Sequence, residues 1–194
     1  MMLPLLLILI LFFALAMILP SIRVWSSTGI NPLVLARDDS AEGFVAKVFK
    51  LALIALAGYF FLGSLGLTTG VGNFQWPWPA VTKQVGWGII AVSLVWVLSA
   101  QVNMGRSWRI GIDHARSTDL VSSGLFRFSR NPIFLGMVTV LVGVVLVQPD
   151  AVTLAALVAG FISISVQIRL EELHLSRLHG ERYSQYCDKV RRWI

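Results

Sequence analysis

The stretch IFLGMVTVLVGVVLVQPDAVTLAALVAGFISISVQI, residues 133–168, decides the fold of this chain. Two apolar runs without charged side chains, 133–147 and 151–168, are separated only by Gln148, Pro149 and Asp150. Because this turn composition reverses the chain direction, we predict a tight antiparallel helical hairpin. The first run is short for a complete bilayer crossing at about 1.5 Å rise per residue, so the depth of the hairpin stays open.

The rest of the chain is equally apolar. Hydrophobic residues make up 56% of the 194 residues and charged residues only 13%, which does not suit a water-soluble domain. Backbone groups in lipid have no water to bond, so each apolar run is expected to be a helix. The five runs free of charged side chains are 3–19, 51–67, 85–102, 133–147 and 151–168. We therefore predict an all-α integral membrane protein with five transmembrane helices and a cytoplasmic C-terminal helical segment.

The distribution of Lys and Arg predicts the orientation. The connection 68–82 has no charge and is rich in Trp and Pro, which is typical of an interfacial belt. With the N-terminus outside, 15 of the 16 Lys and Arg residues fall on one face, which the positive-inside rule assigns to the cytoplasm. The first run is expected to be a retained span, because no basic segment precedes it and no clear cleavage site follows it.

Several classes of site are not expected. Cys187 is the one cysteine, which excludes an intrachain disulfide and a cysteine zinc site. His174 and His179 are five residues apart and so on different helix faces, and no metal site is predicted. No strand-borne GxGxxG and no P-loop occur. The net charge of +6 suits anionic lipid headgroups, and no aromatic-interleaved basic strand indicates nucleic acid.

Two polar blocks flank the hairpin and hold most of the ionisable residues. The first, 103–132, ends in GLFRFSRNP, where Pro132 suits the first turn of a helix. The unpaired N–H groups and positive dipole end of such a helix suit a ligand carboxylate, and Arg130 adds a forked donor. The alternative is that Arg127 and Arg130 are positive-inside anchors.

The second polar block, 169–186, supplies the opposite charge. Glu171 and Glu172 follow an apolar helix directly, at a depth where an isolated carboxylate is costly. Two interpretations stay open. In the first, the two glutamates pair with arginines of the first polar block. In the second, one of them accepts hydrogen bonds from a hydroxyl or amine of a cofactor.

The motifs LVSSGLFRFSRNPIFLG at 120–136 and RLEELHLSRLHGERYSQYCDKVRRW at 169–193 together resemble a known family. They are similar to the isoprenylcysteine carboxyl methyltransferases and their small prokaryotic relatives, which share a cofactor region with phospholipid N-methyltransferases. The likeness covers about the C-terminal half. It implies one membrane domain, 1–194, with three N-terminal spans in 1–102 and a cofactor-binding catalytic region in 103–194.

The resemblance also implies S-adenosylmethionine as cofactor, with S-adenosylhomocysteine as product, on the cytoplasmic side. Phe126 and Phe134 stand where the family has tyrosines, and either ring can still stack on adenine. Asn131 replaces a histidine and cannot titrate, so no acid or base role is assigned to it. The residues expected to bind the cofactor are His114, Thr118, Asp119, Leu120, Val121, Phe126, Arg130, Asn131, Pro132, Ile133, Phe134 and Glu171.

The implied methyl acceptor is a lipophilic small molecule or a prenylated substrate from the bilayer, with the carboxylate of an isoprenylcysteine-like compound favoured. Gln167 stands where the eukaryotic enzymes have an arginine proposed to hold that carboxylate. We therefore assign the catalytic positions to Arg169 and Glu172. The membrane would be the cell membrane in a prokaryote or the endoplasmic reticulum in a eukaryote, and the oligomeric state is left open.

Three alternatives stay open. N-methylation of a phospholipid amine would use a similar cofactor site, and the loss of the arginine at Gln167 leans toward it. A sterol-type reductase would bind nicotinamide instead. A non-catalytic membrane scaffold or small transporter could show the same spans, but transporters usually place polar residues at mid-membrane. The spans here hold mostly isolated serines, such as Ser93, Ser163 and Ser165.

Overall fold

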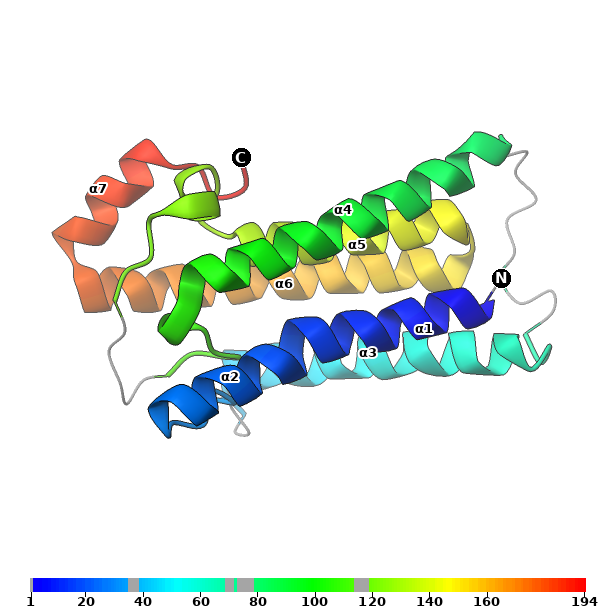
Figure 1. Cartoon of the computed structure of the whole chain (residues 1–194), viewed down its shortest axis with the longest axis horizontal. Coiled ribbons are helices and arrows are strands. Elements are labelled where there is room, and N and C mark those ends of the chain that lie inside the picture. The colour runs from blue at the N-terminus through cyan, green and yellow to red at the C-terminus, as the bar shows by residue number, and fades with distance from the viewer. Residues whose placement is uncertain (1, 35–38, 69–71, 73–78, 114–118) are drawn as a thin grey trace.

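The computed structural model describes residues 2–34, 39–68, 72, 79–113 and 119–194. Long helices dominate this part of the chain, and they run roughly parallel or antiparallel to one another (Figure 1). No strand forms among the described residues. They contain only an isolated parallel bridge between Leu33 and Ile110. The all-helical fold class is therefore confirmed for the described chain.

The first apolar run forms a longer helix than predicted. It continues past residue 19 as α1 (Met2–Phe13), the π-helical turn η1 (Ala14–Ile18) and α2 (Leu19–Thr28). Pro20 lies in the first turn of α2, where its missing N–H is tolerated next to the irregular turn. The α2 helix ends at Gly29, which adopts a left-handed conformation with φ of 67°.

The next two helices are α3 (Ala41–Ser64) and α4 (Ala80–Met104). Ser40 caps α3 by accepting a hydrogen bond from the Gly43 N–H at 3.1 Å. After α4 come the two short 3₁₀ turns η2 (Gly105–Ser107) and η3 (Gly124–Arg127). The predicted second span ends at residue 67, but α3 already ends at Ser64.

The helices α5 (Pro132–Val147) and α6 (Ala151–His179) run side by side in opposite directions (Figure 1). Asp150 fixes the turn between them, because its fully buried carboxylate accepts hydrogen bonds from the Thr153 N–H at 2.8 Å and the Tyr59 hydroxyl at 2.6 Å. The α5 helix packs closely on α4 through glycine. A Cβ atom at Gly143 would lie 2.7 Å from the Ile90 side chain.

Within the described ranges, four helical segments are long and apolar enough to cross a bilayer: Met2–Thr28, α3, α4 and α6. Large apolar side chains are exposed along them, as lipid contact requires. The chain is therefore an integral membrane protein. The α5 helix, with 16 residues, is shorter, so a fifth complete span stays a prediction. The α6 helix does not end near residue 168 but continues as one helix through Glu171 and Glu172.

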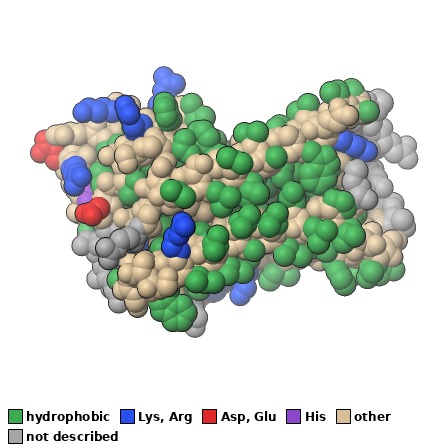
Figure 2. All heavy atoms as spheres, viewed as in Figure 1, with side chains coloured by type: hydrophobic (Ala, Val, Ile, Leu, Met, Phe, Trp, Pro, Cys, Tyr) green, Lys and Arg blue, Asp and Glu red, His purple; other side chains and the backbone are tan. Residues whose placement is uncertain are grey.

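The two polar blocks lie at the same end of the molecule. The connections after α2 and α4 meet there with α7 (Glu181–Lys189) and the C-terminus, while the α5–α6 turn lies at the opposite end (Figure 1). Hydrophobic side chains cover the middle of the visible surface, and charged side chains gather mainly toward the α7 end (Figure 2). The fold thus brings the ionisable residues of distant segments together.

Candidate functional site

A largely apolar cavity lies near the α7 end of the helical bundle. Its walls come from η1, α3, the end of α4, the loop after η2, the start of α5 and the middle of α6. Helices from both halves of the chain therefore enclose one space. The cavity also reaches between the helices, toward Phe49 on α3 and Met137 on α5.

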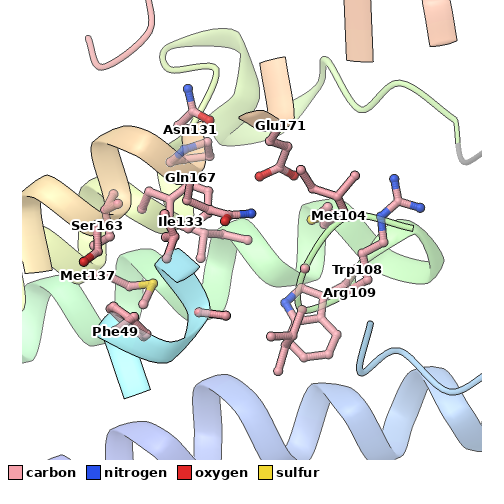
Figure 3. Close-up of a pocket in the computed structure, with 18 of the residues that line it drawn as sticks. Phe49, Met104, Trp108, Arg109, Asn131, Ile133, Met137, Ser163, Gln167 and Glu171 are labelled. Atoms are coloured by element: carbon pink, nitrogen blue, oxygen red, sulfur yellow. The ribbon is translucent and has the colours of Figure 1, made fainter. Parts of the chain in front are cut away.

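One wall of this cavity carries a polar stripe from α6. Ser163, Gln167 and Glu171 recur every fourth residue, which places them on one helix face. Glu171 lies at the end of the cavity near Arg109, and Ser163 lies at the end near Met137 (Figure 3). Among the described residues, none of the three stripe side chains makes a hydrogen bond. The stripe therefore presents unused polar groups to the cavity.

The opposite wall is a loop held by backbone pairing. The Ile110 N–H donates to the Pro32 carbonyl, and the Ile110 carbonyl accepts from the Val34 N–H, both at 2.9 Å. Trp108 on this loop is buried. Arg109 lines the cavity beside it (Figure 3). The segment after α2 thus holds this loop in place, and the loop itself lines the cavity.

Glu172, next to Glu171, does not line the cavity but contacts Arg130 and Arg192. We call these three residues, with the backbone contacts around them, the tail clamp. The Arg192 Nε and Nη2 donate to Glu172 Oε2 at 3.0 and 2.6 Å, and Arg130 Nη2 lies 3.1 Å from Glu172 Oε1. The Glu172 and Arg130 side chains are only 13% and 14% exposed. Hydrogen bonding to Glu172 raises the pKa of Arg192 above its ordinary value. The first polar block thus pairs with the second through Glu172.

Backbone contacts complete the tail clamp. The Arg130 N–H donates to the Arg191 carbonyl at 2.9 Å, and Asn131 Nδ2 donates to the Arg192 carbonyl at 3.1 Å. The Tyr186 hydroxyl donates to the Phe126 carbonyl at 2.7 Å. Burial raises the pKa of Tyr186 to about 12, so its hydroxyl remains a donor at neutral pH. The C-terminal segment is thereby held against η3 and the start of α5.

The structure brings part of the predicted cofactor set to the cavity. This part consists of Phe126, Arg130, Asn131, Pro132, Ile133, Phe134 and Glu171. Asp119 is exposed, and Val121, although half-buried, does not line the cavity either. Leu120 packs against the buried cluster of Tyr183, Tyr186 and Val190. His114 and Thr118 lie outside the described residues.

The two predicted catalytic residues do not lie on the cavity wall. Arg169 is exposed and donates to the Ser165 carbonyl at 2.8 Å, and Glu172 is occupied in the tail clamp. The polar cavity residues outside the predicted site set include Glu42, Gln101, Arg109, Ser163 and Gln167. The four-residue spacing of the α6 stripe was a usable signal for Ser163 and Gln167. No sequence signal connects Gln101 to the cavity.

Comparison with known proteins adds one finding to this geometry. A family model described as phospholipid methyltransferase matches residues 81–182, which contain most of α4, all of α5 and all of α6. The match includes Arg130 and Glu171. Comparisons with curated proteins and with solved structures give no match.

Proposed function

Because the chain belongs to the phospholipid methyltransferase family, we propose that it transfers a methyl group from S-adenosylmethionine to a lipophilic acceptor taken from the bilayer. The observation that carries this proposal is Glu171, a carboxylate on the wall of a largely apolar cavity with no hydrogen bond among the described residues. A carboxylate in such surroundings normally has a partner or a function. Arg109 gives Glu171 a charge interaction but no hydrogen bond within the described chain, and a ligand with amine or hydroxyl donors would supply the missing hydrogen bonds.

The cavity residues fit this cofactor. Glu171 can accept hydrogen bonds from its amine or hydroxyl groups, and Phe126 and Phe134 offer aromatic surface to an adenine ring. Arg130 also lines the cavity. The tail clamp holds its guanidinium, yet its buried Nε has no partner among the described residues. S-adenosylmethionine, when bound, supplies a methyl group on a sulfonium, which an electron-rich acceptor can attack directly.

The protein's own contribution is alignment and the exclusion of water. The loop that carries Trp108 is held by two backbone hydrogen bonds, and the tail clamp holds the start of α5. Two walls of the cavity are therefore positioned before any ligand binds. Such preorganisation can lower a barrier by about 7–11 kcal/mol in favourable cases. No general base is required when the acceptor is already ionised.

The favoured acceptor is the carboxylate of an isoprenylcysteine-like compound. Gln167 lines the cavity but has no charge, and Arg169 is exposed away from it. Arg109 lines the cavity and is not engaged by the tail clamp. We therefore assign the binding of the substrate carboxylate to Arg109 in place of Arg169.

A phospholipid amine is the second candidate acceptor. It is favoured by a different observation, because the carboxylates of Glu42 and Glu171 both line the cavity and would attract an ammonium group. The nitrogen must lose a proton before its lone pair attacks the sulfonium methyl, and the Glu171 carboxylate is placed to accept that proton. In either case we place the site on the cytoplasmic side with the N-terminus outside. The connections and tail rich in Lys and Arg share the α7 end.

Two measurements test this proposal. Calorimetric titration of the detergent-solubilised protein with S-adenosylhomocysteine should show binding, and no binding by folded protein at millimolar ligand would refute the proposal. Incubation with methyl-labelled S-adenosylmethionine and either N-acetylfarnesylcysteine or phosphatidylethanolamine then identifies the acceptor. A base-labile methyl ester supports the carboxylate, whereas a base-stable label on the lipid supports the amine. Arg109→Ala should reduce only ester formation.

A further inference from the structure

The amide of Gln101 has a fixed orientation at the cavity. Gln101 is on α4 and only 7% exposed, and its Nε2 donates to the Ala16 carbonyl in the π-helical turn η1. Because a carbonyl oxygen can only accept, the nitrogen of the amide must face Ala16. The Oε1 atom is therefore turned away from Ala16. It is buried and has no hydrogen-bond partner among the described residues.

An unused acceptor at this place is unusual. Buried side-chain oxygens nearly always have a partner, and leaving one without a partner destabilises the protein. Gln101 also lines the cavity, so a ligand there is the natural source of the missing donor. The bond to Ala16 accounts for the amide nitrogen and its orientation, but it leaves the amide oxygen without a partner in the described chain.

Two neutral side chains of the α6 stripe face the same cavity. Ser163 is 4% exposed, and neither Ser163 nor Gln167 makes a hydrogen bond within the described chain. Apolar side chains such as Met137 and Ile164 line the cavity around them. Gln101, Ser163 and Gln167 are thus neutral polar side chains that line the same largely apolar cavity. We call these three residues the inner subsite.

We propose that the inner subsite recognises a hydroxyl or amide N–H within the lipophilic part of the methyl acceptor. This inference rests on the proposed function in taking the ligand to be that acceptor. The Gln101 oxygen requires a donor, and the absence of charge in the subsite excludes an ionised group. A plain alkyl or prenyl chain would leave the oxygen unpaired. The proposed acceptor is therefore narrowed to an isoprenylcysteine-like compound or lipid that carries such a donor in addition to its apolar chain.

The position of the subsite separates it from the charged end of the cavity. Gln167 and Ser163 lie about 6 and 12 Å along the helix axis from Glu171, at about 1.5 Å rise per residue. The cofactor amine and the reacting group belong at the Glu171 and Arg109 end. The donor at the inner subsite therefore belongs to a linkage or hydroxyl further along the acceptor.

A matched pair of probes tests this inference. Dodecanamide and methyl dodecanoate have similar length and the same carbonyl, but only the amide has N–H donors. Calorimetric titration of the detergent-solubilised protein should show dodecanamide binding about fivefold to thirtyfold more tightly. Ser163→Ala and Gln101→Met should each reduce that ratio, with Gln101→Met bringing it close to one.

Controls keep the result interpretable. Ser99→Ala is a matched change on the exposed face of α4, where Ser99 bonds to the Val95 carbonyl, and it should leave the ratio unchanged. Gln101→Met also removes the donor to Ala16. If that variant does not fold, Gln167→Leu replaces it, because it breaks no hydrogen bond in the described chain. The partition of each probe into micelles is measured in protein-free detergent and corrected for, and it cancels when the ratios of two variants in the same detergent are compared.

Each outcome decides a different claim. Suppose that the wild-type protein binds S-adenosylhomocysteine but binds the two probes equally, or binds neither. The inner subsite is then overturned, while the proposed function stands. Failure of the titration with S-adenosylhomocysteine in folded protein overturns the proposed function instead. A loss of S-adenosylhomocysteine affinity in Ser163→Ala comparable to that in Glu171→Gln would assign the subsite to the cofactor and contradict the inference.

Discussion

Glu171 and Glu172 are adjacent on one helix, yet they belong to two regions with opposite character. In the tail clamp, Glu172 meets two guanidinium groups, and every contact joins distant parts of the chain. In the cavity, Glu171 has no hydrogen bond among the described residues, and it shares its face of α6 with Gln167 and Ser163. Successive residues on a helix point about 100° apart, so one step along α6 leads from one region to the other.

The difference indicates that, at this end of the molecule, one group of residues stabilises the fold and another is available for a ligand. A satisfied network of charges holds segments in place, because removing one member leaves the others buried and unpaired. Within the part of the chain that the structure describes, the polar side chains of the α6 stripe make no hydrogen bond that would hold the fold, and they are available to bind a ligand. The two interpretations that the sequence left open for the glutamates are therefore complementary, with pairing observed for Glu172 and ligand binding proposed for Glu171.

The largest effect is expected from breaking the tail clamp. Glu172→Gln removes the charge that Arg130 and Arg192 share, and we expect the free energy of unfolding to fall by about 3 kcal/mol. Thermal unfolding in detergent, followed by tryptophan fluorescence, measures the loss. Glu181→Gln, an exposed change on α7, is the control and should have little effect. An unchanged melting temperature in Glu172→Gln would show that the clamp does not stabilise the fold.

The second effect is expected at the cavity. Glu171→Gln should weaken S-adenosylhomocysteine binding about tenfold or more, because a hydrogen bond to a charged acceptor is lost. The melting temperature of the free protein should hardly change. Titration calorimetry and thermal unfolding of the same preparation separate the two quantities. If unfolding is destabilised as much as in Glu172→Gln, then Glu171 is structural and the comparison of the two regions is wrong.

A smaller effect is expected at Tyr186, whose hydrogen bond joins the C-terminal segment to a residue of the cavity wall. Tyr186→Phe removes the hydrogen bond to the Phe126 carbonyl, which we expect to cost about 1 kcal/mol of stability. Phe126 itself lines the cavity, so S-adenosylhomocysteine affinity should fall by less than in Glu171→Gln. Unfolding curves and calorimetry test both statements. A loss of affinity larger than in Glu171→Gln would place Tyr186 in the binding site.

The smallest effect is expected at Arg127. Its side chain is exposed on η3, and no hydrogen bond or ion pair involves it within the described chain. Arg127→Ala should therefore change the stability by less than about 0.5 kcal/mol and leave S-adenosylhomocysteine binding intact. The same two assays apply. A loss of stability as large as that in Glu172→Gln would mean that an exposed arginine at this end supports the fold as much as the paired ones. The ion pairs of the tail clamp would then not explain the stability of this region.

Much of the architecture followed from local patterns in the sequence. The apolar runs located the long helices, although their ends were missed wherever a polar segment continued the same helix, as at Glu171 and Glu172. Part of the stretch predicted to bind the cofactor lines the cavity, as Phe126 and Arg130 do, and its role there stays a prediction. The sequence could not predict whether Arg169 faces the cavity, because the direction of a side chain on a helix depends on how that helix packs against the others.

The sequence by itself determined that the chain lies in a bilayer and is helical, because an apolar segment without water must satisfy its backbone groups internally. It also located the two polar blocks that hold most of the ionisable residues. Only the tertiary structure decided which polar side chains are paired and which remain available. The partners of Glu172 and Gln101 come from positions 20 to 85 residues away. Side-chain pairing is therefore a property of helix packing, which the order of residues along one segment does not contain.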